Sequence, residues 1–254
     1  MSPLARLQEI VHRLRAPDGC PWDREQTHAS LKPYLLEECY ELLEAVDLGD
    51  AVLLKEELGD LLLQVVLHSQ IASEDGRFTL DDVAVGIADK LVRRHPHVFG
   101  AQRLPDSDAV LKQWDQLKRT EKAERRSVLD GVPGPLPALA RAQKVQGKAA
   151  RVGFDWTDPQ GAWAKVHEET AEVQAADPED VAEELGDLLF SVVNYARKRK
   201  VDAEQALLGA TRKFAVRFSA MEALAAERGV KLEELSLAAL DALWEEVKAQ
   251  PERR

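Results

Sequence analysis

The stretch Glu183-Glu184-Leu185-Gly186-Asp187-Leu188-Leu189-Phe190 decides the fold predicted for this chain. At 3.6 residues per turn, Glu184 and Asp187 project from one face of a helix, and the same stripe continues through Ser191 and Asn194. The other positions of this helix are mostly leucine, valine and phenylalanine. A surface helix normally turns its charges to water and an apolar stripe to the core. Because apolar residues cover most of this helix, we expect the carboxylates to point into a partly enclosed place.

A second acidic motif precedes this stretch, and the whole arrangement occurs twice in the chain. Glu168-Glu169-x-x-Glu172 stands in the later half, and Glu37-Glu38-x-x-Glu41 precedes Glu56-Glu57-Leu-Gly-Asp60 in the earlier half. Two carboxylates about 4 Å apart repel each other by roughly 4 kcal/mol at an effective dielectric constant of about 20. A divalent cation such as Mg²⁺, which prefers oxygen ligands, relieves this repulsion. We therefore predict two carboxylate-lined metal sites, against the alternative of solvated glutamate-rich helix faces. The candidate ligands are Glu169, Glu172, Glu184 and Asp187, and in the earlier half Glu38, Glu41, Glu57 and Asp60.

These motifs resemble the signature of the MazG family of all-α nucleoside triphosphate pyrophosphohydrolases, in which Glu-Glu-x-x-Glu is followed by Glu-x-x-Asp. The runs Cys20-Pro21-Trp22-Asp23 and Arg93-Arg94-His95-Pro96-His97-Val98-Phe99 are also similar to full-length bacterial members, and the resemblance covers nearly the whole chain. It implies cleavage of nucleoside triphosphates into nucleoside monophosphate and pyrophosphate with Mg²⁺, which Mn²⁺ can replace. It also implies a homodimer.

Composition limits the other functions open to the chain. Of its 254 residues 45% are hydrophobic, enough for one large or two small cores, and no apolar run approaches the roughly 20 residues that span a bilayer. The net charge of −11 argues against binding to a nucleic-acid polymer, whereas a free nucleotide screened by Mg²⁺ remains compatible with it. Two cysteines and an N-terminus without a signal-like apolar region predict a cytoplasmic protein that does not bind membranes.

Hydrophobic periodicity predicts an all-α protein built as a tandem repeat of two lobes with four to five helices each. The helices are expected over residues 1–15, 34–48, 51–73, 80–94, 109–126, 138–151, 160–175, 179–198, 203–228 and 237–248. The proline- and glycine-rich residues 130–137 mark a boundary. We thus predict an N-terminal lobe over 1–130, a linker and bridging helix over 131–150, and a C-terminal lobe over 151–254.

Further pairs of residues recur in the same order and favour an internal duplication. Trp22 in the earlier half corresponds to Trp156 in the later half. The pair Lys90 and Arg94 answers Lys213 and Arg217, and the pair Trp114 and Lys118 answers Trp244 and Lys248.

Five residues outside the acidic motifs are candidates for holding the substrate. Lys213 and Arg217 lie one turn apart and could clamp phosphates, unless they form an exposed basic face. Trp244 could stack on a base with Lys248 nearby, although its spacing alone favours a half-buried core residue beside Leu240 and Leu243. Lys165 could contact the nucleotide or simply pair with Glu169 one turn later. The family resemblance favours the nucleotide role for all five.

The two halves differ at one informative position. Asn194 can donate and accept hydrogen bonds, as contact with a base or ribose requires, whereas its counterpart Leu67 can do neither. We therefore expect the C-terminal lobe to carry most of the turnover. Either Glu168 or Glu169 is expected to serve as the general base that activates water, and the sequence does not separate base from ligand.

Several competing functions lack their motifs. The chain has no Gly-x4-Gly-Lys-Ser/Thr phosphate loop. Only Glu25-Gln-Thr-His28 fits the Glu-x-x-His pattern that a di-iron bundle needs in duplicate. A Nudix pyrophosphatase would need a mixed α/β fold. The remaining alternative is a non-catalytic acidic scaffold that binds a basic partner or a structural Mg²⁺.

Overall fold

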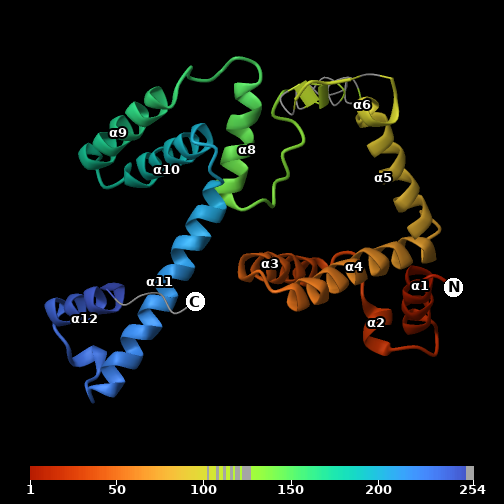
Figure 1. Cartoon of the computed structure of the whole chain (residues 1–254), viewed down its shortest axis with the longest axis horizontal. Coiled ribbons are helices and arrows are strands. Elements are labelled where there is room, and N and C mark those ends of the chain that lie inside the picture. The colour runs from red at the N-terminus through yellow and green to blue at the C-terminus, as the bar shows by residue number, and fades with distance from the viewer. Residues whose placement is uncertain are drawn as a thin grey trace. The chain divides into compact units, whose positions relative to one another are not determined.

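The computed structural model describes residues 1–101, 103–106, 109–110, 113–114, 117, 121 and 127–249. The chain divides into two compact units, Met1–Ala123 and Glu124–Arg254, called here the first and second unit. Every regular element in the described residues is helical (Figure 1). None of these described helices is long and apolar enough to cross a membrane. The fold is therefore all-α, as predicted.

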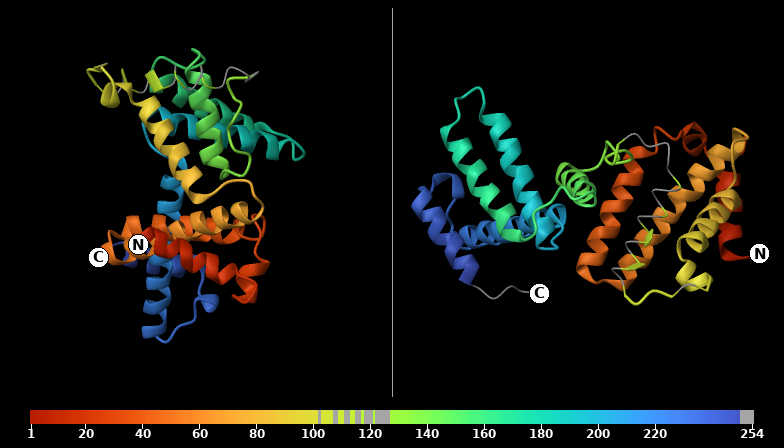
Figure 2. Two further views of the ribbon diagram at one scale, coloured as in Figure 1. Left: turned by 90° about the vertical axis from the view of Figure 1, so that its right-hand side faces the viewer. Right: turned by 90° about the horizontal axis from the view of Figure 1, so that it is seen from above.

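The first unit is built around a pair of long helices, α3 and α4. Its elements are α1 Pro3–Arg15, α2 Pro21–Glu25, α3 Lys32–Leu48, α4 Ala51–Glu74, α5 Leu80–Arg94 and α6 Pro96–Phe99. Helix α4 packs against α3 along one side, and the C-terminal half of α4 packs against α1 (Figures 1 and 2). The core of this unit is formed by Val11, Leu31, Val66, Leu67, Ile71 and Leu80.

A tight turn makes α3 and α4 antiparallel. Gly49 ends α3 with a φ of 65°, a left-handed conformation that glycine adopts without steric cost. Asp50 then caps α4, because its Oδ1 accepts hydrogen bonds from the backbone N–H groups of Val52 and Leu53 at 2.8 and 3.2 Å. The turn places the acidic ends of both helices opposite each other.

The second unit repeats this antiparallel pair as α9 and α10. Its elements are α8 Ala138–Ala150, α9 Pro159–Ala175, α10 Val181–Lys198, α11 Ala203–Glu227, the short 3₁₀ helix η1 Leu232–Glu234 and α12 Leu237–Ala249. Helix α8 packs on α10 and α11, and α12 lies along the far half of α11 (Figure 1). Met221, Ala225, Leu243 and Val247 form a core between α11 and α12.

The start of α9 is fixed by a cap and by a close ring contact. Asp158 Oδ1 accepts from the backbone N–H groups of Gln160 and Gly161 at 2.7 and 3.2 Å. A Cβ atom at Gly161 would lie only 2.1 Å from Cδ1 of Trp156. Glycine is therefore required where the indole lies against the first turn of the helix.

The predicted long helices are confirmed to within two residues at each end. Three short elements, α2, α6 and η1, were not predicted, because three to five residues carry no periodicity. The predicted helix over 109–126 lies largely outside the described residues, as does Lys118. The predicted boundaries near residues 130 and 150 stay predictions; α8, the predicted bridging helix, packs within the second unit.

Apolar side chains remain exposed on several helices of the single chain. On α10 they follow one another at helical spacing, and on α11 several lie near its middle. The exposed set includes Leu185, Leu189, Phe190, Val192, Phe214, Val216 and Phe218. The expectation that apolar residues would enclose the acidic stripe is thus met only in part, because one chain leaves much of α10 uncovered.

Candidate metal centre

Three carboxylates converge where α9 and α10 lie side by side in the second unit. One oxygen each of Glu169, Glu172 and Glu184 lies within 4.8 Å of the others, and this set is called here the α9–α10 carboxylate group. The group contains one buried residue, Glu169, with 5% of its surface exposed. Glu184 is half-buried and Glu172 is exposed. The antiparallel pairing of the two helices brings Glu184 close to Glu172 and Glu169, which precede it by twelve and fifteen positions.

A lysine one turn earlier on α9 neutralises part of this charge. Lys165 Nζ lies 2.6 Å from Oε1 of Glu169 and 2.7 Å from Oε1 of Glu168. The hydrogen bonds to Glu168 and then to Glu169 raise the pKa of Lys165. The ion pair expected from the sequence is confirmed, and Lys165 remains charged beside the carboxylate group.

Crowding of like charges is visible in the ionisation of Glu172. Removal from water, followed by the hydrogen bond and the charge of Glu169, raises the pKa of Glu172 above its ordinary value. Such a carboxylate is stabilised in its charged form when a cation joins it.

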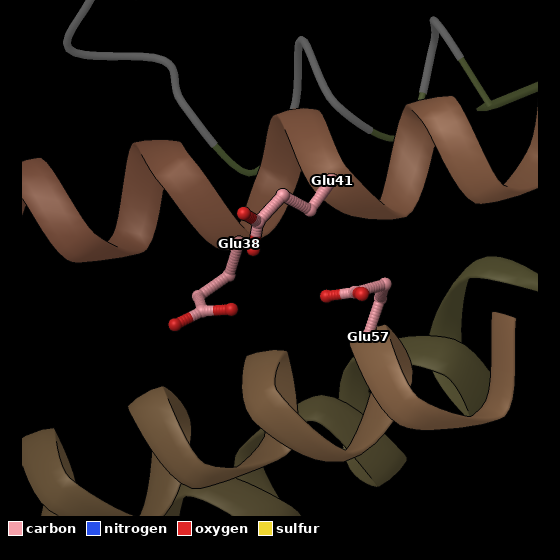
Figure 3. A group of neighbouring side chains, drawn as sticks. All are labelled: Glu38, Glu41 and Glu57. Carbon is pink, nitrogen blue, oxygen red and sulfur yellow. The ribbon is translucent and has the colours of Figure 1, made fainter. Parts of the chain in front are cut away.

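The first unit contains a matching set on α3 and α4. Oxygens of Glu38, Glu41 and Glu57 lie within 4.8 Å of one another, and the three side chains meet in the space between the two helices (Figure 3). Burial and then the charge of Asp60 raise the pKa of Glu38, and burial and then the charge of Glu41 raise that of Glu57. Among the described residues, no lysine or arginine forms an ion pair with this α3–α4 carboxylate group.

The sequence explains why the α3–α4 carboxylate group lacks the ion pair that Lys165 makes in the second unit. The position that answers Lys165 is Tyr34, which carries no positive charge. The two carboxylate groups thus have matching glutamates, but among the described residues only the α9–α10 group is paired with a lysine.

The two aspartates predicted as ligands are not brought into these groups. Asp187, one turn beyond Glu184 on α10, is exposed and lies outside the α9–α10 carboxylate group. Asp60 lies outside the α3–α4 group but is close enough for its charge to raise the pKa of Glu38. The assignment of both as ligands stays a prediction.

The predicted substrate-binding residues of α11 and α12 have other neighbours in the single chain. Trp244 is half-buried and its ring lies 5.2 Å from that of Phe214, as the core-packing alternative expected. Lys248 Nζ pairs with Glu245 at 2.6 Å. Lys213 is exposed and Arg217 half-buried on α11. Their roles in binding stay predictions.

The earlier counterpart of the pair Lys213 and Arg217 has a structural role. Arg94 on α5 is buried and pairs with Glu121, whose other partner, Arg93, lies at 2.8 Å. Hydrogen bonds from Arg94 and Arg93 lower the pKa of Glu121 to about 2. His95, two positions from His97, caps α5 and places its Nδ1 2.7 Å from the carbonyl oxygen of Leu91.

Asn194 is buried in the polar stripe of α10, and its surroundings were not predicted. Its side-chain oxygen accepts hydrogen bonds from Arg197, which in turn binds Asp155. Its acceptor is thus engaged by Arg197 in the single chain, and the predicted contact of Asn194 with a base or ribose stays a prediction. Asp155 and Arg197 are 42 positions apart, and no local pattern joins them.

Comparisons with known proteins agree with this architecture. The model of the MazG nucleotide pyrophosphohydrolase domain matches residues 26–99 and 159–220, which contain α3–α4 and α9–α10 respectively. The nucleoside triphosphate pyrophosphohydrolase/pyrophosphatase MazG of Thermotoga maritima is 52% identical, over 97% of this chain and 96% of its own. The nucleoside triphosphate pyrophosphohydrolase of Escherichia coli K12 is 46% identical, over 98% of both chains. Two copies of the domain and likeness over nearly the full length show that the chain belongs to the MazG family.

Proposed function

We propose that the protein hydrolyses nucleoside triphosphates, including deoxynucleotides, to nucleoside monophosphate and pyrophosphate with Mg²⁺ at the α9–α10 carboxylate group. The observation that carries this proposal is the meeting of Glu169, Glu172 and Glu184 from two helices within 4.8 Å. The names of the two relatives describe the same reaction.

The donor set fits a hard divalent cation. All three groups offer carboxylate oxygens, the ligands that Mg²⁺ and Mn²⁺ prefer. Removal from water and then the neighbouring Glu169 raise the pKa of Glu172, and a bound cation would stabilise its charged form. Glu169, Glu172 and Glu184 would hold the ion, with Asp187 as a fourth ligand. Mg²⁺ usually keeps waters and substrate phosphates in its remaining positions, which suits a group open on the Glu172 side.

The side chains around the group have separate tasks in the proposed reaction. A bound divalent cation lowers the pKa of an attacking water and neutralises charge on the phosphate oxygens. Lys165 fixes the orientation of Glu168 and Glu169 through its two short contacts. One of these two glutamates accepts the proton of the attacking water, and Glu168, which is exposed, is within reach of solvent. Pyrophosphate then leaves from the α-phosphorus, as the family resemblance implies.

The proposed assembly is a homodimer that acts in the cytoplasm. The exposed apolar residues of α10 and α11 form faces that a second copy would cover, because large exposed apolar patches mark interaction sites. A monomer measured by light scattering would rule out this assembly.

The dimer also supplies a way for the cations of α11 to reach the substrate. In one chain α11 begins beside α8 and α10 and carries α12 on its far half, away from the hairpin tip where α9 ends and α10 begins (Figure 1). We place Lys213 and Arg217 of one chain on the phosphates bound by the other. Mixing inactive Glu172→Ala and Arg217→Ala chains should then restore part of the activity, which a site confined to one chain would not allow.

The products of the reaction test the proposed function directly. The protein is incubated with the four deoxynucleoside triphosphates, with Mg²⁺ and separately with excess EDTA, and the phosphorus species are resolved by ³¹P spectroscopy. We expect monophosphate and pyrophosphate with Mg²⁺ and no product with EDTA. Orthophosphate as the sole product would indicate attack at the γ-phosphorus. No product with Mg²⁺ or Mn²⁺ would favour the alternative, a non-catalytic acidic scaffold.

A further inference from the structure

Two histidines of the first unit form a hydrogen-bonded pair that takes no part in the proposed reaction. His28 lies in the segment between α2 and α3, and His68 lies on α4, 40 positions later. Their Nδ1 atoms are 2.7 Å apart, and their ring planes are parallel to within 3°. A hydrogen bond between two imidazoles needs one donor and one acceptor, so one Nδ1 carries a proton and the other does not.

The direction of this hydrogen bond is set by Arg77. Its Nη2 lies 2.7 Å from Nε2 of His28 and 2.6 Å from Oδ2 of Asp75. A guanidinium has donors only, so Nε2 of His28 accepts and the proton of His28 is on Nδ1. His28 therefore donates to Nδ1 of His68, and the proton of His68 is on Nε2. Both rings are neutral in this arrangement, each as one tautomer.

The turn that ends α4 directs Arg77 toward the pair. Gly76 has a φ of 66°, a left-handed conformation that suits glycine. The backbone N–H of Arg77 then donates to the carbonyl oxygen of Ala72 at 2.9 Å, which closes the end of the helix. The guanidinium is thus placed by the same turn that terminates α4.

The segment that carries His28 is ordered by its own hydrogen bonds. The backbone N–H of Thr27 donates to Oγ of Ser30 at 2.9 Å, and the backbone N–H of Ser30 donates to Oγ1 of Thr27 at 3.1 Å. Leu31, at the end of this segment, is only 1% exposed and belongs to the core of the first unit. The histidine pair therefore connects an ordered segment, and the start of α3 that follows it, to α4.

Uptake of a proton would break the arrangement at either ring. On His28 the added proton would occupy Nε2 and face the guanidinium of Arg77. On His68 it would occupy Nδ1 and face the N–H of His28. Nε2 of His68 is buried, and no acceptor among the described residues binds it. Burial first and then the charge of His28 lower the pKa of His68, in agreement with this geometry.

The other charged groups on the elements around this end of α4 have partners of their own or are exposed. Those with partners are His12, Arg15 and Glu74, between α1 and α4, and Asp82 at the start of α5. The exposed ones are Arg24 and Glu25 on α2, Lys32 on α3 and Asp81 on α5. Among the described residues, Arg77 is thus the charged group that contacts the pair, with Asp75 behind it.

We propose that His28 and His68 form an acid-sensitive latch, which holds the segment before α3 on α4 while both rings are neutral and releases it when either ring takes up a proton. Histidine is the side chain whose charge ordinarily changes near neutral pH. The latch joins the two helices that carry the α3–α4 carboxylate group, and it does not depend on the hydrolysis proposed above. In the second unit the position that answers His68 is Tyr195, so acid loosens the first unit alone by this route.

The sign of the effect follows from the tautomers. Because the folded state binds a proton at the pair less readily than the unfolded state does, the stabilisation is present above a pH of about 6.5. It is lost as the pH falls below that value.

The tautomers can be measured without any substitution. The full chain is labelled with ¹⁵N-histidine, and long-range ¹H–¹⁵N NMR at pH 7.5 reports which ring nitrogens carry protons. We expect a proton on Nδ1 of His28 and on Nε2 of His68. Any other pair of tautomers, or a charged ring at this pH, would overturn the inference.

The release of the segment is tested by amide hydrogen exchange in the wild-type protein. Exchange rates corrected for their intrinsic pH dependence are compared at pH 7.5 and 5.5 for residues 26–31 and, as an internal control, for α10. We expect the exchange of residues 26–31 to rise about 3- to 10-fold in acid, as the uptake of one proton with a shifted pKa implies, and that of α10 to change less. Equal changes in the two segments would contradict the latch.

A substitution that removes the titration but keeps the contact completes the test. In His68→Asn the side-chain oxygen can accept from His28 in place of Nδ1, and it does not take up a proton in this range. Between pH 7.5 and 5.5, we expect the midpoint of thermal unfolding to fall about 2–4 °C less in His68→Asn than in the wild-type protein. The control His167→Asn, an exposed histidine of α9, should follow the wild-type protein. Equal losses in all three proteins would overturn the inference, and if His68→Asn does not fold, the tautomers and the exchange rates decide.

Discussion

Lys165 is the residue on which the electrostatics of the α9–α10 carboxylate group depend. It lies 2.6 Å from the buried Glu169, and we predict that Lys165→Met lowers kcat/KM about 10- to 100-fold, the usual effect of removing a residue that orients a metal ligand. A buried carboxylate without its positive partner takes up a proton more readily, so the acidic limb of the pH–activity profile should move to higher pH. Lys231→Met, which breaks an exposed pair with Glu234, serves as the control. An unchanged profile in Lys165→Met would show that Lys165 has no such role.

Glu121 should control how the first unit responds to acid. Its pKa is lowered to about 2 by Arg94 and Arg93, so the folded state binds its proton less readily than the unfolded state does. The stabilisation is then present above a pH of about 4.5 and is lost as the pH falls toward 2. We expect Glu121→Gln to lower the midpoint of thermal unfolding at pH 6 and to match the wild-type protein near pH 2. Glu9→Gln, on the exposed face of α1, should match it at both pH values.

At the residue scale, the sequence predicts what helical spacing controls and misses what tertiary contacts decide. Glu169 and Glu172 share a face because they are three residues apart, and the structure brings them together with Glu184. Asn194 was singled out because Leu67 replaces it in the first half, but its partner Arg197 became significant only through Asp155. The apolar residues around Asp187 predict that its carboxylate is enclosed. In one chain these residues remain uncovered, and Asp187 is exposed with them.

At the scale of elements, the cap of α9 links stability to the site. Asp158 accepts two backbone hydrogen bonds at the start of the helix that carries Glu169 and Glu172. We predict that Asp158→Ala destabilises the second unit by about 1 kcal/mol. Asp177→Ala, in the turn between α9 and α10, removes an exposed carboxylate of the same size and should have a smaller effect in thermal unfolding. Equal shifts for the two variants would contradict the capping role.

The long helices could be predicted because glycine, proline and capping aspartates bound each apolar repeat. Gly49 and Asp50 mark the end of α3 and the start of α4 within one or two residues. The packing partners of the helices were harder to predict from the sequence. Trp244 has the spacing of either a core residue or a base-stacking residue, and its packing on the α11–α12 core together with its contact with Phe214 favours the core. No pattern in the sequence predicts how α11 packs relative to the α9–α10 pair.

At the scale of the whole molecule, the two repeated units differ in the residues that accompany their carboxylates. Both hold three converging glutamates, but Tyr34 and Leu67 stand in the first unit where Lys165 and Asn194 stand in the second. We therefore predict that Glu172→Ala lowers kcat/KM for deoxynucleoside triphosphates at least 100-fold, whereas Glu41→Ala changes it only slightly. The two substitutions remove equivalent carboxylates, so each is the matched control of the other. Equal losses would mean that both units contribute to turnover.

The sharing of one cation between α9 and α10 is tested most directly by the Mg²⁺ dependence of hydrolysis in Glu184→Gln. Glu184 is the ligand that α10 contributes to the group, and the amide keeps its size while removing its charge. We expect the Mg²⁺ concentration for half-maximal activity to rise at least tenfold relative to the wild-type protein, as weaker metal binding requires. A Glu184→Gln protein with wild-type activity and an unchanged Mg²⁺ dependence would show that the carboxylates of the two helices do not hold a common ion.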